Sequence, residues 1–191
     1  DKNNPYPEEV NRRMISSMAS IHYCATSNER QYLINEGLHE DSIKVTGNTV
    51  IDNLKSVKIK KTNKIILTLH RRENHDKVKE WFSTFDRLAS EYKQYEFIFL
   101  THPNPNISSL VNQLKNVLVI DQIPHEEMVE LISSCHCLIT DSGGLQEESS
   151  FFKKLCFVCR RVTERPCESS ILCKDPQTLY INFCNLHNKV I

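Results

Sequence analysis

The segment Thr140-Asp141-Ser142-Gly143-Gly144-Leu145-Gln146-Glu147-Glu148 decides the fold predicted for this chain. The apolar run at residues 137–139 predicts a buried strand before it, and residues 146–153 predict a helix after it. Two glycines between strand and helix let the backbone approach a ligand closely, and the first amides of the helix favour a phosphate group. Glu148 lies about one turn further on, where its carboxylate could accept hydrogen bonds from a ribose diol. The alternative is a tight strand-to-helix turn that binds nothing.

Apolar strand-like runs alternate with helical patterns along most of the chain. The helical pattern at residues 77–92 has Trp81, Phe82, Phe85 and Leu88 on one face. Such alternation predicts an α/β fold, with a parallel sheet covered by helices on both faces. We expect strands at residues 21–25, 43–46, 65–69, 97–100, 117–120, 138–139 and from Leu155, and helices at residues 8–20, 49–54, 77–92, 107–114, 126–133 and between Ser27, as its cap, and Gly37.

Polar loops follow the predicted strands, at the edge where an open parallel sheet binds its ligand. His70-Arg71-Arg72-Glu73-Asn74 follows one strand, and His102 lies just after the next. The loop 121–125 and the Gly143-Gly144 turn follow two more. A cation-rich loop, a histidine loop and a glycine turn at one edge form a candidate diphosphate pocket. A solvated surface is the alternative for the His-Arg-Arg-Glu run.

The composition excludes several classes of protein. The 191 residues are 39% hydrophobic and 25% charged with zero net charge, so nothing favours nucleic acid or an anionic membrane as a partner. No apolar run is long enough to span a bilayer, and no signal peptide is visible, which predicts a cytoplasmic location. The lysine-rich residues 58–64 predict a solvated linker. Because the chain begins at Asp1 without an initiator methionine, we expect a fragment or a processed product.

The eight cysteines do not predict a metal site. Cys156 and Cys159 form a CxxC, but they lie in an apolar run that predicts a strand, and no second pair occurs at zinc-site spacing. We therefore expect them to be small hydrophobic core residues, reduced in the cytoplasm.

Six short motifs follow one another along the chain, and in this order they resemble the second half of the non-hydrolysing UDP-N-acetylglucosamine 2-epimerases. The resemblance covers residues 5–166. The motifs are Pro5-Tyr6-Pro7-Glu8-Glu9-Val10-Asn11-Arg12, Val45-Thr46-Gly47-Asn48-Thr49-Val50-Ile51-Asp52, His70-Arg71-Arg72-Glu73-Asn74, Asn104-Pro105-Asn106, residues 141–148 and Thr163-Glu164-Arg165-Pro166.

The resemblance implies Rossmann-like domains in a GT-B-like arrangement and interconversion of UDP-GlcNAc and UDP-ManNAc. In that reaction the C2 proton leaves, UDP is expelled to give a glycal, and UDP adds again after the proton returns to the other face. No metal or redox cofactor is implied. The residues implied as catalytic are Glu8, an acid/base carboxylate, and His70, on the phosphate side; those expected to bind the UDP-sugar are Arg71, His102, Ser142, Gly143, Gly144, Glu148 and Arg165.

The chain also departs from the family. The first Rossmann-like domain is almost entirely absent, with its basic phosphate contact and two further carboxylates. Met128 stands where the family has an aromatic residue near the uracil. We therefore expect residues 1–55 to be a remnant of the first domain, 56–63 a linker, 64–165 the UDP-binding Rossmann-like domain and 166–191 a divergent tail. The expected protein partner is a second copy of the chain or a complementing N-terminal half.

Three other functions stay open. One is a non-catalytic fragment that binds a nucleotide-sugar. Another is the C-terminal domain of a GT-B glycosyltransferase, which the His-Arg-Arg-Glu-Asn run disfavours. The third is a hydrolysing 2-epimerase, which would release free ManNAc and UDP.

Overall fold

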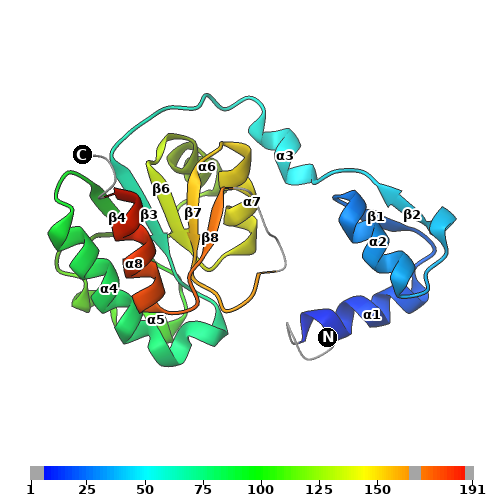
Figure 1. Ribbon diagram of the computed structural model, residues 1–191, viewed down its shortest axis with the longest axis horizontal. Coiled ribbons are helices and arrows are strands. Elements are labelled where there is room, and N and C mark those ends of the chain that lie inside the picture. Colours follow the sequence, from blue (N-terminus) through cyan, green and yellow to red (C-terminus); the bar gives the residue numbers. More distant parts are fainter. Residues whose placement is uncertain (1–6, 164–168, 188–191) are drawn as a thin grey trace. The chain divides into compact units, whose positions relative to one another are not determined.

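The computed structural model describes residues 7–163 and 169–187, and the chain divides into two compact units. The smaller unit is Asp1–Asn53 and the larger is Leu54–Ile191. Figure 1 shows the elements of both. The expected division into residues 1–55, 56–63, 64–165 and 166–191 stays a prediction.

The smaller unit contains a two-stranded parallel sheet flanked by helices. Its strands are β1 (His22–Cys24) and β2 (Ile43–Val45), and α3 (Thr49–Leu54) leads out of the unit. The N-cap of α2 is Thr26, not Ser27. The side chain of Thr26 accepts a hydrogen bond from the amide of Glu29, and the carboxylate of Glu29 accepts one from the amide of Thr26. The remaining elements are α1 (Glu8–Met18), α2 (Ser27–Asn35) and the 3₁₀ turn η1 (Glu40–Ser42).

Apolar side chains of the smaller unit are exposed to an unusual degree. Ile21 is 50% exposed, Tyr23 70% and Val45 46%. Among the described residues before Leu54, only Cys24 and Ile43 are buried hydrophobic side chains. The sequence of these strands therefore has the pattern of half-buried strands. Their apolar side chains are nevertheless left exposed by the described part of the smaller unit.

The larger unit contains a six-stranded sheet in the order β5-β4-β3-β6-β7-β8, and every pair of neighbours is parallel. β3 lies centrally, with Ile66 opposite Ile98 on one side and Leu138 on the other. This confirms the predicted parallel sheet. The strands are β3 (Lys64–Thr68), β4 (Glu96–Leu100), β5 (Leu118–Ile120), β6 (Cys137–Thr140), β7 (Leu155–Val158) and β8 (Ser170–Leu172).

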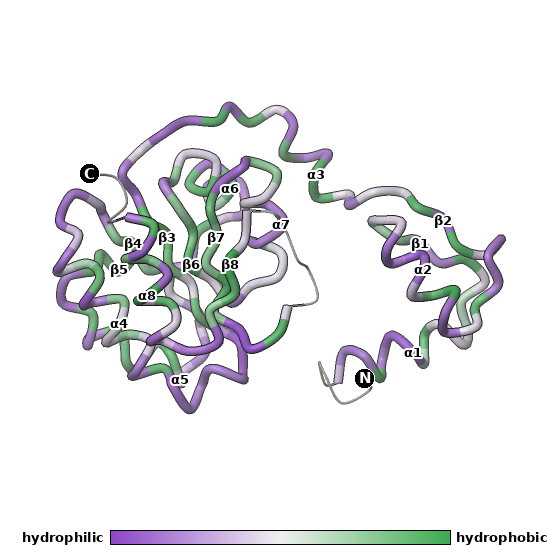
Figure 2. The backbone as a smooth tube through the Cα atoms, viewed as in Figure 1, coloured by the Kyte–Doolittle hydropathy of each residue, from purple (hydrophilic) through white to green (hydrophobic). Residues whose placement is uncertain are grey.

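Alternating strand residues divide the core into two layers. Ile65 and Leu67 face a cluster that includes α4 and α8, whereas Ile66 between them faces a cluster packed against α6 and α7. Figure 2 shows that hydrophobic residues are concentrated along these strands. Helices therefore cover both faces. The helices and 3₁₀ turns are η2 (Arg72–Lys77), α4 (Val78–Glu91), α5 (Pro105–Ser108), η3 (Val111–Gln113), α6 (His125–Ser134), α7 (Gly143–Phe151) and α8 (Pro176–His187).

Two segments differ from the sequence-based expectation. The helix expected at residues 107–114 is two short pieces, because the amides of Leu110, Gln113 and Leu114 bond to carbonyls three residues back. The last residues, which had no periodic pattern, supply β8 and α8 to the same sheet and core. Cys156 and Cys159 are fully buried, which confirms them as core residues.

The lysine-rich segment has exposed side chains but a fixed backbone. The amide of Lys60 donates to the carbonyl of Ser133, and the amide of Thr62 donates to Ser134. Lys154, only 7% exposed, donates from Nζ to the carbonyls of Lys60 (2.7 Å) and Cys135 (2.9 Å). This buried ammonium therefore ties the segment to the base of the sheet.

Helix α7 ends in a left-handed turn whose residue is not glycine. Lys153 has φ of 53°, and within the described residues no other non-glycine has a positive φ. The amide of Lys153 bonds to Ser150 and that of Lys154 to Ser149, which are the two bonds of a Schellman cap.

We predict that Lys153→Gly raises the free energy of unfolding by about 1 kcal/mol, since glycine adopts the left-handed conformation without steric cost. Urea denaturation measures the change. The control Lys93→Gly lies in a turn where φ is not positive, so it should stabilise nothing. Equal effects of the two substitutions would contradict this account of the cap.

Candidate functional site

A pocket of about 300 Å³ opens at the carboxyl ends of β3, β4 and β6. Counted from the central strand outwards, the sheet has the doubly wound order, and its direction of winding reverses between β3 and β6. Ligands bind at this switch point in open α/β sheets. The pocket lining includes Thr68, His70, His102, His125, Met128, Ser142 and Leu145.

The carboxylate of Asp141 joins the loops that follow β3 and β6. Asp141 is fully buried and accepts the backbone amides of His70 (3.0 Å) and Arg71 (2.8 Å). Its Oδ1 also lies 3.2 Å from Nδ1 of His70. The hydroxyls of Thr68 and Thr140 are 2.6 Å apart just below, in the two strands. One buried acid therefore shapes the cation-rich loop.

Asn74 completes this network from the side of the core. Its Nδ2 donates to Asp141 (2.9 Å) and to the carbonyl of Cys159 (2.9 Å), and its Oδ1 accepts from the indole of Trp81 (3.2 Å). Because an indole nitrogen only donates, this bond sets which way the amide points. Asn74 and Asp141 were not among the predicted site residues. In the sequence, only their position indicated a role, since each lies in a motif just after a central strand.

The rings of His70 and His102 are stacked, with centroids 5.3 Å apart. Nδ1 of His70 faces the carboxylate of Asp141, which only accepts, so the contact favours the neutral tautomer with the hydrogen on Nδ1 and with Nε2 as the acceptor. His102 has the opposite arrangement, because its Nδ1 accepts from the amide of Asn104 (3.2 Å). Burial lowers the pKa of His70, and Asp141 opposes this by raising it. The pocket thus holds one imidazole acceptor and one imidazole donor.

Helix α7 begins beside the pocket, but earlier than the sequence predicted. Gly143 and Gly144 are its first two residues rather than a turn before it, and Ser142 is the N-cap. The helix starts early because Ser142 Oγ accepts the amide of Leu145. A Cβ added at Gly144 would meet only Ser142 Oγ, at 4.0 Å. The free amides of the first turn and the helix dipole make this end suited to an anion.

Glu148 lies one turn further along α7 and is 5% exposed. Its Oε1 is 3.1 Å from Nε2 of His125, whereas its Oε2 is buried without a hydrogen-bond partner. A buried carboxylate oxygen without a partner is costly, so it marks a place for a hydroxyl donor. His125, the first residue of α6, was not predicted as a site residue, and only its place at the end of the predicted loop 121–125 indicated it in the sequence.

The remaining predicted residues are placed as follows. Arg71 follows His70, and its Nε is buried without a partner. Glu8 is the first residue of α1 in the smaller unit, where it is exposed. The structure does not describe how the two units lie, so Glu8 and His70 are not brought together here. Arg165 lies outside the described residues.

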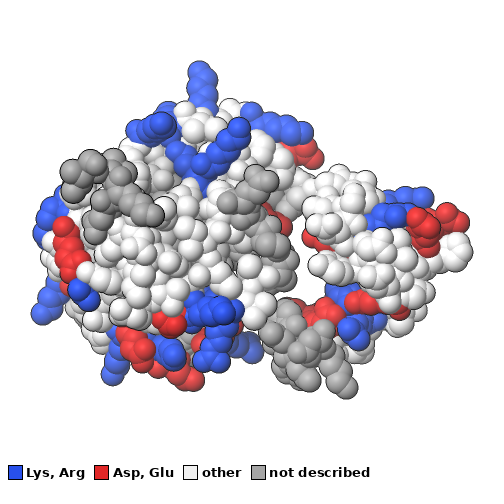
Figure 3. Space-filling view, viewed as in Figure 1, with Lys and Arg blue, Asp and Glu red and all other residues white. Residues whose placement is uncertain are grey.

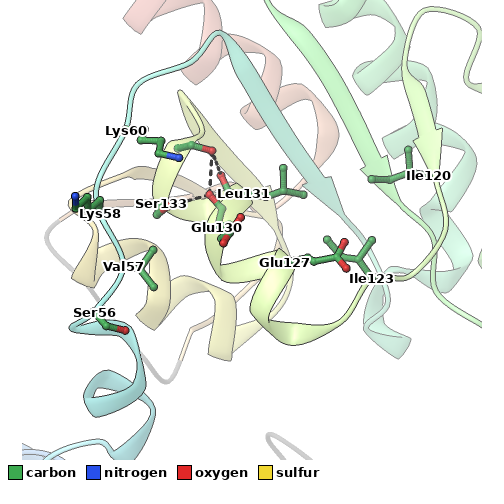
Figure 4. Close-up of a pocket in the computed structure, with 11 residues that line it drawn as sticks. Ser56, Val57, Lys58, Lys60, Ile120, Ile123, Glu127, Glu130, Leu131 and Ser133 are labelled. Atoms are coloured by element: carbon green, nitrogen blue, oxygen red, sulfur yellow. Dashed lines mark hydrogen bonds between the residues drawn. The ribbon is translucent and has the colours of Figure 1, made fainter.

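A second hollow, of about 680 Å³, lies between the lysine-rich segment and α6 (Figure 4). Its lining includes Lys58, Lys60, Glu127 and Glu130, which are of mixed sign. It is larger than the pocket at the switch point, but it has neither a helix N-terminus nor a buried unpartnered side chain in its lining. We therefore place the candidate site at the smaller pocket.

The surface charge is mixed. Figure 3 shows lysine and arginine interspersed with aspartate and glutamate along the lower rim of the larger unit on this face. Among the described residues, no three or more His, Cys, Asp or Glu side chains are grouped to hold a metal ion. No helix in the described part of the chain is long and apolar enough to cross a membrane.

The strand order and the pocket at the switch point define a doubly wound α/β protein. A family model described as UDP-N-acetylglucosamine 2-epimerase matches residues 1–175. The chain therefore belongs to this family, as its motifs predicted.

Individual relatives agree with the family match. The UDP-N-acetylglucosamine 2-epimerase of Neisseria meningitidis serogroup A is 36% identical over 186 residues, which cover 85% of this chain and 50% of that protein. The crystal structure of the UDP-GlcNAc 2-epimerase from Neisseria meningitidis bound to UDP-GlcNAc matches with a TM-score of 0.86 at 30% identity, covering 98% of this chain and 58% of the other. The S. aureus MnaA–UDP co-structure gives 0.85 at 28%, with coverage of 98% and 57%. The chain thus spans about half the length of the curated relatives it matches.

We predict that two substitutions move the pKa of His70 in opposite directions. Asp141→Asn removes the charge that raises this pKa and should lower it further, whereas His102→Gln removes a group that lowers it and should raise it. NMR titration of the ring measures both. The pKa of His70 is lower in the folded state than in the unfolded state, so folding favours the neutral ring. The resulting contribution to stability is complete above the unfolded-state pKa and is lost as pH falls through the folded-state pKa. Shifts of equal sign would contradict the arrangement of charges.

Proposed function

We propose that this chain is the nucleotide-binding part of a UDP-N-acetylglucosamine 2-epimerase, and that the complete enzyme interconverts UDP-GlcNAc and UDP-ManNAc. The proposal rests on Oε2 of Glu148, which is buried and has no hydrogen-bond partner. Glu148 lies one turn along α7, and the N-terminus of this helix lies beside the pocket. A ribose hydroxyl supplies the missing donor, and a diphosphate supplies the anion for the first turn. Both groups occur together in a nucleoside diphosphate.

In this proposal the diphosphate lies against the first turn of α7. The amides of Gly143 and Gly144 face it, because neither residue has a side chain to keep it away. Ser142 caps the same turn and lines the pocket. His102 donates from Nε2, and Arg71 and Arg165 add positive charge. No metal is needed for this arrangement.

The proposed chemistry follows from the acceptor and donor groups. UDP leaves from C1 as the C2 proton is removed, so negative charge develops on the leaving diphosphate. The helix N-terminus and His102 stabilise that charge. His70, neutral and with Nε2 as its acceptor, takes up or returns a proton on the phosphate side, and Glu8, the first residue of α1, is the second acid/base group.

The complete reaction needs more than the described residues. Residues 1–55 are, in this proposal, part of a first Rossmann-like domain whose remaining strands cover the exposed Ile21, Tyr23 and Val45. The protein partner is a complementing N-terminal half, or a second copy of the chain in a homodimer. The location proposed is the cytoplasm, where nucleotide-sugars are available to the enzyme.

We predict that Gly144→Val abolishes binding of UDP while the fold is retained. A Cβ at this position has only Ser142 Oγ near it, so the side chain enters the space assigned to the phosphate rather than the core. Calorimetry or ligand-observed NMR at millimolar UDP measures the weak binding expected of the isolated chain, and thermal unfolding checks the fold.

Binding of uridine, which has the ribose but no diphosphate, distinguishes the ribose contact from the diphosphate contact. Glu148→Gln should weaken uridine and UDP alike, by about tenfold for a lost charged hydrogen bond, whereas Gly144→Val should weaken only UDP. Unchanged UDP affinity in Gly144→Val would remove the diphosphate site from α7. Uridine binding that is indifferent to Glu148→Gln would remove the ribose contact.

We further predict that the 191-residue chain alone shows no exchange of the C2 proton of UDP-GlcNAc for deuterium, because it spans about half the length of its relatives and each general acid or base of the other half would contribute about 10²–10⁴-fold. Adding a matching N-terminal half should restore exchange, and Glu8→Gln or His70→Ala should then reduce it sharply. Mass spectrometry in deuterated water measures the exchange. Strong exchange by the chain alone, or indifference of the completed enzyme to both substitutions, would overturn the catalytic assignment.

A further inference from the structure

Two imidazoles face each other at the amino-terminal edge of the large sheet, opposite the edge that holds the pocket. His136 directly precedes β6, and His187 is the last residue of α8 (Figure 1). Their Nε2 atoms are 3.0 Å apart. The contact joins residues 51 positions apart in the sequence and links the C-terminal helix to a central strand.

A backbone carbonyl determines which ring nitrogen of His187 carries the hydrogen. Nδ1 of His187 lies 2.8 Å from the carbonyl of Phe183, which can only accept, so this nitrogen carries the hydrogen. The neutral ring therefore presents a lone pair on Nε2 toward His136. A histidine whose Nδ1–H is held by a carbonyl while Nε2 is free has the orientation of a metal ligand.

His136 can present a lone pair to the same point. In the observed contact Nε2 of His136 donates to His187; because the side chain of His136 is exposed, this hydrogen can move to Nδ1, toward water, and leave Nε2 free for a metal ion. Two nitrogens that bind one Zn²⁺ at about 2.0–2.1 Å in tetrahedral geometry are about 3.3 Å apart. The observed 3.0 Å requires the rings to separate by a few tenths of an ångström only.

The surroundings hold the rings in place and favour their neutral forms. His187 stacks on Phe183 with centroids 4.0 Å apart, and Tyr95 lies 4.5 Å from the ring of His136. Burial lowers the pKa of both histidines, and Lys154 and His187 lower that of His136 further. Both effects favour the unprotonated ring, which is the form of histidine that binds a metal ion.

We propose that His136 and His187 form a two-histidine site for a divalent transition metal of the Zn²⁺, Ni²⁺ or Cu²⁺ class, with water as the remaining ligands. Imidazole nitrogen suits these ions. The bound metal joins α8 to the start of β6 and stabilises the fold. This site is independent of the nucleotide pocket, so its test does not depend on the proposed enzymatic function.

Calorimetric titration with ZnCl₂ at pH 7.5 tests the proposal. We expect one ion per chain, at least about tenfold weaker binding in His136→Gln and in His187→Gln, and unchanged binding in His39→Gln, whose side chain is exposed in the other unit. His136 is on the surface, so its replacement should leave the fold intact. Saturating Zn²⁺ should raise the unfolding midpoint of the wild type but not of these two variants.

Two results would overturn the site. Equal Zn²⁺ affinity in the wild type and both variants would show that the histidines share only a hydrogen bond. Loss of binding in Cys184→Ser, with binding retained in the histidine variants, would assign the metal to the half-buried thiol one turn earlier in α8. Retained binding in Cys184→Ser supports the two-histidine site.

Discussion

The carboxylate of Asp141 is the group on which the candidate site depends. It directly follows β6, yet it accepts hydrogen bonds from two amides and a side chain of the segment after β3. A fully buried charge is stable only when it is bonded on all sides, so the loop has little freedom to adopt another shape. The backbone amides of His70 and Arg71 and the side chain of Asn74 are all held by this one requirement, and Asn74 in turn accepts from the indole of Trp81.

The fold was largely predictable because its signals are local. Continuous apolar strands such as β3 and β4, and the periodic face of α4 with Trp81 and Phe85, determine layers and strand direction without long-range information. The last strand and helix were not predictable in this way. β8 is three residues long and half-buried, and it becomes a strand only because β7 offers an edge to pair with.

The candidate site was predicted in its residue types but not in its connections. His70, His102 and the segment Ser142-Gly143-Gly144 lie just after strands, so topology alone brings them to one edge. The pairing of His125 with Glu148, and that of Asn74 with Asp141, join residues 23 and 67 positions apart. Such pairs depend on side-chain direction in three dimensions. The start of α7 was missed by three residues, because a serine cap outweighed the low helix propensity of two glycines.

The sparse core of the smaller unit has a consequence for cooperativity. With Cys24 and Ile43 as its described buried apolar side chains, this unit gains little from hydrophobic burial, whereas the larger unit has two extended clusters. The two parts of the chain are thus separate foldons of very different local stability. Amide protons of β1 and β2 should exchange with solvent while those of β3 and β6 stay protected, and a melting curve of the chain reports the larger unit alone.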